Sequence, residues 1–365
     1  MKNLLIVFFL VNSFQLFAQD CNCLVNFDYM TSKVSRNYSG YGDKIKAGNK
    51  ETFDNFTKEL RKKASSIKTS DACFIVLKTW TNYFRDQHLK VQLNGAYKKA
   101  NPVQTKEINA YFSQKKETVS EQLSGQTEIK QLDEQTLLLR LPSFEWSEKK
   151  MIDSLLKSQQ PLLKKMPYWI IDIRGNRGGT DHTFQSLVPY LYTQPYIGKS
   201  DEYWSSEDNI AMLEKNLKGI NPATPQGNFL KTIISLMKKN PGQFVNPLGK
   251  DTFSSALDSA YTYPRKIGIL INRESMSSAE SFLLIAKQSK KVTLFGENSG
   301  GTLDYANTQY FDIPCGDYSL AIAISRSKRL PKNPIDNIGI PPDIKINPLE
   351  KDKVQLVQQQ LRTDN

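Results

Sequence analysis

The second half of the chain alternates continuous apolar runs with runs whose apolar residues recur every three or four positions. The continuous runs are typical of buried strands and lie at 136–141, 168–173, 266–272 and 292–296, with two paired strands at 309–313 and 318–324. Helices are predicted at 147–157, 180–191 and 277–286, and a long excursion at 196–263 contains one more near 229–239. The alternation predicts an α/β fold, a sheet covered by helices, in a core at 133–350.

The first part of the chain has the residue spacing of helices. Phe53, Phe56 and Leu60 share one face of a helix for which Thr52 is a candidate cap. A second helix starts at Ser70 or Asp71, and a short strand is predicted at 89–93. We therefore expect a smaller helical N-terminal domain at 19–95, a connecting segment at 96–132 and a C-terminal tail at 351–365.

The N-terminus has the pattern of a secretion signal. Lys2 supplies a positive charge, residues 4–9 are apolar, and residues 16–18 end in the small side chain of Ala18. We expect a signal peptide at 1–18, cleaved near Ala18, and an exported protein, periplasmic or extracellular. The apolar run is too short for a permanent membrane helix, so no stable membrane insertion is expected. Asp20 argues against lipid modification of Cys21.

Four cysteines remain after the leader: Cys21, Cys23, Cys73 and Cys315. Outside the cytoplasm such cysteines can form disulfides, and four of them allow three pairings. We expect Cys21 or Cys23 to pair with Cys73, which ties the N-terminus to the first helical region. Cys315 is then expected to be free and buried.

The net charge of +12 is distributed over scattered lysines. Neither interleaved aromatic residues nor a nucleic-acid motif accompanies them, so solvated surface accounts for the charge better than a nucleic-acid partner. We expect no nucleic acid among the partners, and the sequence leaves the oligomeric state open.

Ser277 stands where a predicted strand turns into an apolar helix. A serine at this position has unpaired backbone N–H groups and the positive end of the helix dipole beside its hydroxyl. These groups could hold the oxyanion that forms when a serine attacks a carbonyl. The same residue could also simply cap the helix, as serine often does. The sequence of this segment alone does not decide whether Ser277 is a nucleophile or a helix cap.

A serine nucleophile needs a base, and the chain has only two histidines, His88 and His182. His182 follows a glycine-rich turn, 175–179, at the end of a predicted buried strand. That turn could donate a backbone N–H to an oxyanion, or it could be an ordinary strand-to-helix connection. It lacks the spacing of a phosphate-binding loop. With only two histidines, the candidates for a general base are few, but their number alone does not show which of them acts.

Four motifs in order resemble those of the tail-specific or C-terminal-processing serine peptidases. They are Asp-Ile-Arg-Gly-Asn-Arg-Gly-Gly at 172–179, Ser-Met-Ser-Ser-Ala-Glu at 275–280, Leu-Phe-Gly-Glu at 294–297 and Asp-Asn-Ile-Gly-Ile-Pro-Pro-Asp at 336–343. The resemblance covers about 136–346 and implies a crotonase/ClpP-like core. The stretch 296–302 has no lysine where the serine–lysine branch carries its base. The chain is therefore closer to the tricorn-core branch, which uses a serine, a histidine and an acid.

The resemblance assigns roles residue by residue. Ser277 matches the nucleophile, and His88, in a weaker motif at 84–89, matches the base. Asp336 stands where that branch has a glutamate and matches the acid with a shorter side chain. The oxyanion donors would be the N–H of Ser278 and that of a turn glycine, Gly178 or Gly179. Glu280 is expected to help position the start of the helix.

The function implied is that of an exported serine-type endopeptidase acting through an acyl-enzyme on protein or peptide substrates. Neither a metal nor an organic cofactor is implied. Two other interpretations stay open. One is a non-catalytic binding module of the same fold, which holds an apolar ligand or a peptide; the other is an esterase or amidase for small substrates, which the same chemistry could support.

Overall fold

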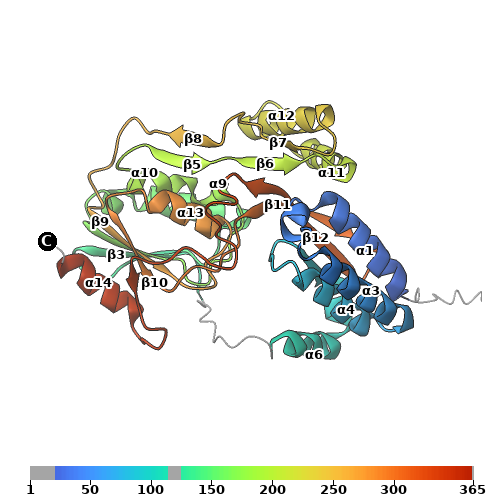
Figure 1. Cartoon of the computed structure of the whole chain (residues 1–365). Helices are drawn as coiled ribbons and strands as arrows, with labels where there is room; N and C mark the ends of the chain where they lie inside the picture. Colours follow the sequence, from blue (N-terminus) through green and yellow to red (C-terminus); the bar gives the residue numbers. More distant parts are fainter. Residues whose placement is uncertain (1–20, 114–124, 364–365) are drawn as a thin grey trace, which may run out of the picture.

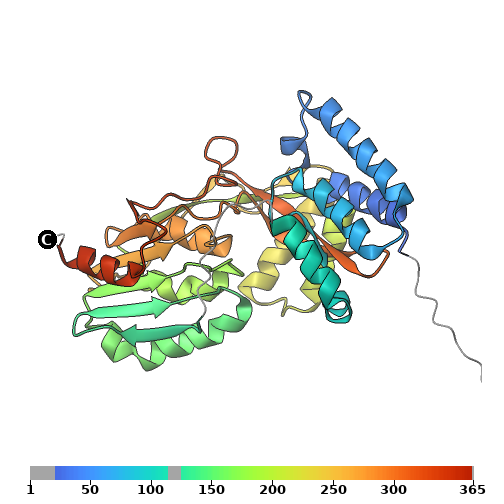
Figure 2. The same cartoon turned by 90° about the horizontal axis from the view of Figure 1, so that it is seen from below.

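The computed structural model describes residues 21–113 and 125–363. The predicted signal peptide lies outside the described residues. A helical N-terminal part and an α/β core lie side by side, with strands β11 (Tyr305–Asp312) and β12 (Tyr318–Ser327) of the C-terminal half reaching into the N-terminal part (Figures 1 and 2). The protein is thus a mixed α/β structure, as the alternation of patterns predicts.

The N-terminal helices bury one shared apolar cluster against β12. They are α1 (Cys23–Asn37), α2 (Tyr41–Lys44), α3 (Lys50–Ser66) and α4 (Ser70–Asn82), followed by β1 (Lys90–Leu93), α5 (Gly95–Ala100) and α6 (Pro102–Ser113). Trp80, Phe84 and Phe27 are among the fully buried side chains of this cluster, which also takes in Tyr305 and Leu320 from the last strands. Burial of this apolar surface fixes the segment after α4, and with it His88.

The core contains a six-stranded sheet in the order β13-β10-β9-β4-β3-β2. Its strands are β2 (Glu128–Gln131), β3 (Thr136–Arg140), β4 (Tyr168–Asp172), β9 (Lys266–Ile271), β10 (Val292–Gly296) and β13 (Ile344–Lys345). Strands β3, β4, β9, β10 and β13 pair in parallel, and β2 is antiparallel to β3. The parallel strands end at one edge, where the segments after β4 and β9 meet.

Helices cover this sheet on both faces. They are α7 (Trp146–Ser158), α8 (Gln160–Leu163), α9 (Asp181–Phe184), the 3-10 helix η1 (Gln185–Leu187), α10 (Val188–Leu191), α13 (Ser278–Ala286) and α14 (Lys353–Thr363). Phe282 and Leu283 of α13 pack with β9 and α10 residues in one cluster. Residues of α14 pack on β4, β9 and β10 in another, with Val357 fully buried. The segment at 351–363, expected to be a tail, thus contributes a helix to the core packing.

A second sheet joins the two parts of the molecule. Its order is β1-β12-β6-β7, with β11 on the other edge of β12. Strands β5 (Tyr196–Lys199), β6 (Asp201–Trp204), β7 (Phe244–Val245) and β8 (Thr252–Ser255) and helices α11 (Glu207–Lys218) and α12 (Pro225–Lys239) form the long excursion. Only the helix near 229–239 was expected there. Because β1 begins two residues after His88 and pairs with β12, this sheet ties the histidine to the core.

The helix caps differ from the predicted ones by up to three residues. Asn49 caps α3 in place of Thr52, and Thr69 caps α4 in place of Ser70 or Asp71. The prediction of a free Cys315 is wrong, because Cys315 forms a disulfide with Cys21. Cys23 pairs with Cys73, in agreement with the expected tie between the N-terminus and the first helical region. The sequence could not reveal that the turn after β11 folds back onto the N-terminus.

Candidate active site

Ser277 occupies the sharp turn between β9 and α13. Its backbone has φ 54° and ψ −121°, a conformation with positive φ that side chains other than glycine rarely adopt. Such strain persists only where the surroundings impose it, and it is concentrated at functional sites. The turn leaves the Ser277 side chain half-buried at the wall of a cleft, whereas the neighbouring Met276 and Ser278 are buried.

His88 reaches Ser277 from the loop between α4 and β1. Its Nε2 lies 3.2 Å from Oγ of Ser277, and its Nδ1 lies 2.6 Å from the backbone carbonyl oxygen of Tyr305. A carbonyl only accepts hydrogen bonds, so Nδ1 carries the proton and Nε2 is left to accept from the serine hydroxyl. The two residues are 189 positions apart in the chain. The geometry is that of a nucleophile and its base.

Asp86 holds the main chain of His88. One carboxylate oxygen of this buried residue accepts the backbone N–H of His88 at 2.8 Å, and the other accepts the hydroxyl of Tyr38 at 2.7 Å. Desolvation by burial lowers the pKa of His88, and the negative charge of Asp86 works against this. Asp86 was not among the predicted site residues, although its place two residues before His88 offered a signal.

Asp336 lies close to Asp86 but is not joined to His88. Among the described residues, its carboxylate accepts the N–H groups of Leu303 and Asp304, each at 2.8 Å, and no hydrogen bond or ion pair links it to His88 or Ser277. Burial, and next the charge of Asp86, raise the pKa of Asp336 to about 8. The following residue, Asn337, donates to the carbonyl of Arg85, so the loop with Asp336 packs against the segment that carries His88.

The glycine turn after β4 lies against Ser277. A Cβ on Gly178 would stand 2.7 Å from the backbone nitrogen of Ser278 and 2.8 Å from Cβ of Ser277, so only glycine allows this approach. The N–H of Gly178 donates to the Asn176 side chain at 2.9 Å and is thereby occupied. The N–H groups of Gly179 and Ser278 have no acceptor in the described part of the chain. These two are the available donors for an oxyanion.

Glu280 fixes the backbone at the start of α13. Its buried carboxylate accepts the N–H of Ser277 at 3.1 Å, the hydroxyl of Ser299 at 2.5 Å, and the N–H groups of Gly301 and Thr302 at 2.8 Å each. Burial raises the pKa of Glu280, and these four donors oppose the rise. The carboxylate therefore ties the nucleophile's turn to the loop after β10, the role expected for this residue near the helix start.

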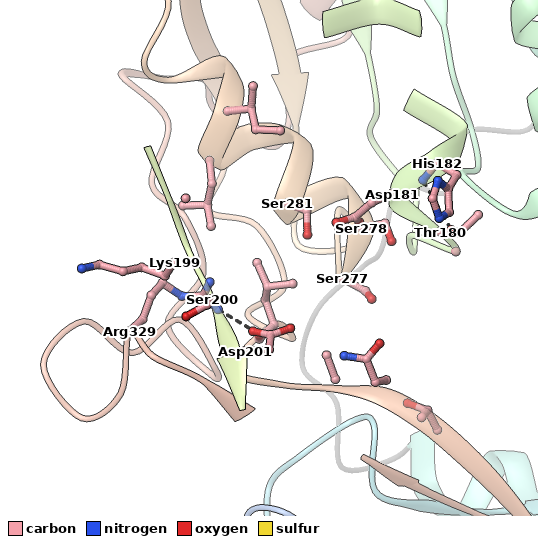
Figure 3. Close-up of a pocket in the computed structure, with 18 of the residues that line it drawn as sticks. Thr180, Asp181, His182, Lys199, Ser200, Asp201, Ser277, Ser278, Ser281 and Arg329 are labelled. Carbon is pink, nitrogen blue, oxygen red and sulfur yellow. Dashed lines mark hydrogen bonds between the residues drawn. The ribbon is translucent and has the colours of Figure 1, made fainter. Parts of the chain in front are cut away.

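A cleft of about 970 Å³ opens at Ser277 and His88. Figure 3 shows Ser277, Ser278 and Ser281 at the start of α13, with Thr180, Asp181 and His182 on one side and Lys199, Ser200, Asp201 and Arg329 on the other. Apolar side chains also line it, among them Ile197, Phe229, Leu248, Phe253 and Tyr310. The cleft is large enough for several residues of an extended peptide. His182 also lines this cleft, but in the described residues no hydrogen bond joins it to Ser277 or His88.

One cluster of metal-ligand type occurs in the described residues: Cys21, Cys315 and Asp317. Its two sulfurs are joined in a disulfide, so they are not thiolate ligands. Within 21–113 and 125–363 no helix has both the length and the apolar character that crossing a membrane requires.

Comparison with known proteins gives a family match and a set of similar folds. The profile of Peptidase family S41 matches residues 135–346. The structure of a candidate peptidase from Parabacteroides merdae is 15% identical with a TM-score of 0.58, covering 94% of this chain and 98% of that chain. Mature CPAF complexed with lactacystin is 12% identical with a TM-score of 0.58, covering 89% and 93% respectively.

A lipoprotein from Streptococcus agalactiae is 16% identical with a TM-score of 0.51, covering 93% of this chain and 96% of that one. At such identities these three similarities show a shared fold. No curated protein matches the chain.

Proposed function

Because the chain belongs to peptidase family S41, we propose that it is a serine endopeptidase in which Ser277 is the nucleophile and His88 the general base. The observation that carries the proposal is the 3.2 Å approach of Nε2 of His88 to Oγ of Ser277. The positive φ of Ser277 supports it further, since a plain helix cap has no need of a strained backbone.

The reaction follows from this geometry. As Oγ of Ser277 attacks the peptide carbonyl carbon, its proton passes to Nε2 of His88. The imidazolium then gives that proton to the leaving amine as the C–N bond breaks, which leaves an acyl-enzyme on Ser277. Water attacks the ester, His88 takes the water's proton, and the released serine recovers a proton from Nε2. The N–H groups of Ser278 and Gly179 hold the oxyanion in both steps.

We assign the third group of the site, which orients and charges the His88 imidazole, from the groups that lie close to His88. The carbonyl of Tyr305 orients the imidazole, and Asp86 supplies the negative charge that stabilises the imidazolium. We assign the electrostatic role to Asp86 in preference to Asp336, because the Asp86 carboxylate binds the main chain of His88 and its charge acts on the ring, whereas no hydrogen bond in the described residues joins Asp336 to His88. The absence of a lysine at 296–302 supports the serine–histidine branch.

We further propose that the protein is exported with 1–18 removed. The two disulfides support this, since such bonds persist in oxidising compartments. A protease-protection assay on intact cells tests the proposed export. Finding the protein in cytoplasmic extracts with Cys315 reduced would contradict it.

A fluorophosphonate probe tests the proposed enzyme class. The wild type should be labelled at Ser277, and the variants Ser277→Ala and His88→Ala should lose the labelling while keeping the wild-type circular dichroism. Absence of labelling in folded wild-type protein would favour a non-catalytic binding module instead. Casein and p-nitrophenyl acetate, assayed in parallel, separate a peptidase from an esterase for small substrates.

A further inference from the structure

Asn176 lies in the turn after β4, and its side chain is completely buried. The side-chain amide is bonded at both ends: Oδ1 accepts the N–H of Gly178 at 2.9 Å, and Nδ2 donates to the carbonyl of Leu141 at 2.9 Å. Leu141 directly follows β3, which pairs with β4. The amide of Asn176 therefore joins the end of one central strand to the turn that follows the next.

Two hydrogen bonds fix the orientation of Gly178, whose carbonyl belongs to the same peptide group as the N–H of Gly179. The N–H of Gly178 is held by Asn176, and its carbonyl accepts the N–H of Phe144 at 3.0 Å. In a trans peptide the next N–H points opposite to the carbonyl, so the N–H of Gly179 is directed away from Phe144. These two bonds thus set the direction of one of the two donors available for an oxyanion.

The main chain of Asn176 meets the turn that carries the nucleophile. Its carbonyl accepts the N–H of Met276 at 2.9 Å, and Met276 immediately precedes Ser277. The N–H of Ser278, the other available donor, lies two residues further along the chain. One residue therefore binds the segments of both donors, that of Gly179 through its side chain and that of Ser278 through its main chain.

We infer that Asn176 is a positioning residue, which fixes the N–H of Gly179 relative to the N–H of Ser278 so that both point at one oxyanion. The inference rests on the proposed peptidase function and specifies how its oxyanion site is held in place. Donors aimed at a developing charge stabilise the tetrahedral intermediate more than the bound substrate. Truncation of the Asn176 side chain should therefore weaken the stabilisation of an oxyanion, while the main-chain bond to Met276 remains.

An adduct with a trifluoromethyl ketone, N-acetyl-alanyl-alanyl trifluoromethyl ketone, makes this oxyanion measurable. Oγ of Ser277 adds to the ketone carbon, the carbonyl electron pair moves to the oxygen, and the serine proton passes to Nε2 of His88. Fluorine NMR as a function of pH gives the pKa of the hemiketal oxyanion. In Asn176→Ala this pKa should rise by about one, a tenfold loss of oxyanion stabilisation. The pKa of His88 in the free enzyme should stay unchanged, because the Ser277–His88 contact does not include Asn176.

Matched variants separate positioning from a general loss of stability. Asn209 is equally buried, and its Nδ2 donates to the carbonyls of Asn37 and Trp204 at 3.0 Å each, outside the cleft. Asn209→Ala should lower the denaturation midpoint and leave the hemiketal pKa at the wild-type value. Asn176→Ser keeps a hydroxyl, which accepts the N–H two residues ahead more weakly than an amide does. Its hemiketal pKa should lie between those of the wild type and Asn176→Ala.

The rate of fluorophosphonate labelling, in which the phosphoryl oxygen takes the place of the oxyanion, should follow the same order. A wild-type hemiketal pKa in folded Asn176→Ala would overturn the positioning role, and so would an equal rise in Asn209→Ala. If Asn176→Ala does not fold, Asn176→Ser decides by the same criterion. Failure of the wild type to react with a fluorophosphonate would overturn the peptidase proposal instead, so the two failures are distinguishable.

Discussion

The backbone carbonyl of Tyr305 occupies the side of His88 where serine hydrolases commonly have a carboxylate, 2.6 Å from Nδ1. Tyr305 begins β11, which is paired with β12 along its length, so the acceptor belongs to a rigid sheet. A neutral carbonyl can fix the tautomer and the ring orientation of His88. In the proposed reaction a nearby charge then stabilises the imidazolium, and Asp86 is the carboxylate that raises the pKa of His88.

Asp336→Asn should change the activity little at neutral pH. Burial, and next the charge of Asp86, raise the pKa of Asp336 and so disfavour its charged form, and no hydrogen bond in the described residues joins this carboxylate to His88. Asparagine keeps an oxygen to accept the N–H groups of Leu303 and Asp304. We expect kcat/KM at pH 7 to stay within about threefold of the wild type, whereas loss of an essential acid costs about 10⁴-fold.

The same variant should alter the pH dependence of stability. In the unfolded chain Asp336 ionises near its ordinary pKa of 3.8, but in the folded protein only near 8. The folded state therefore loses stability relative to the unfolded state as pH rises from about 4 to 8. Asp336→Asn removes this loss, so its Tm should exceed that of the wild type more at pH 8 than at pH 5. A 10³-fold fall in kcat at unchanged stability would restore Asp336 as the acid.

Asp86→Asn should separate the effect of the negative charge of this residue from the effect of its hydrogen bonds. The amide oxygen can still accept the N–H of His88, and the amide nitrogen can donate to Tyr38. Without the negative charge the pKa of His88 should fall further, because Asp86 raises it. The acid limb of the pH profile of kcat/KM, which reports neutral His88, should move to lower pH, and the maximal rate should fall about tenfold.

Tyr38→Phe is the matched control, since it removes one hydrogen bond to Asp86 and leaves the charge. Its acid limb should stay close to that of the wild type. An unchanged acid limb in Asp86→Asn, measured by NMR titration of His88 as well as by kinetics, would contradict the assignment of Asp86.

The sequence indicated the Ser277–His88 pair because each residue carries a local signal. A buried strand that turns into an apolar helix marks Ser277, and a chain with two histidines leaves few candidates for a base. The family match confirms the resemblance at the level of the family. Asp86 was not predicted, because its contacts are with the main-chain N–H of His88 and with the hydroxyl of Tyr38, which follows α1, and no sequence periodicity records such contacts. Asp336 stays a prediction that the variants above test.

The central strands were predictable for a physical reason. Buried on both faces, β4 and β9 have continuous apolar sequences that few other structures share. The strands of the excursion are short and partly exposed, and β5 finds its partner β8 about 50 residues later, beyond any local pattern. The disulfide between Cys21 and Cys315, 294 positions apart, depends in the same way on tertiary packing that a cysteine count does not contain.

Gly178→Ala should disrupt the oxyanion site beside Ser277. The new methyl group would stand 2.7 Å from the nitrogen of Ser278 and 2.8 Å from Cβ of Ser277, and φ at this position is +87°. Loss of an oxyanion donor costs about 100-fold or more in kcat, with a smaller effect on KM. Ala substitution at Gly242, which has φ +69° and open space around it, controls for the backbone strain alone. An equal loss of kcat in both variants would contradict a specific role of Gly178.

Glu280→Gln should loosen the turn that presents the nucleophile. Four donors converge on this buried carboxylate, and a glutamine would direct an N–H₂ group against at least one of them. Leaving a buried donor unpaired costs about 1–3 kcal/mol, which should appear as a lower denaturation midpoint. Because the N–H of Ser277 is among the four, we also expect labelling by a fluorophosphonate to slow about tenfold or more.

Ser299→Ala separates the two effects, since it removes a donor to Glu280 and the acceptor of the Ile340 N–H without touching Ser277. We expect this variant to lose stability by about 1–3 kcal/mol and to keep a labelling rate near that of the wild type. If Glu280→Gln labels at the wild-type rate under conditions where it is fully folded, the carboxylate supports the fold alone. The strained backbone of Ser277 must then be held by the Gly178 turn and the packing of α13.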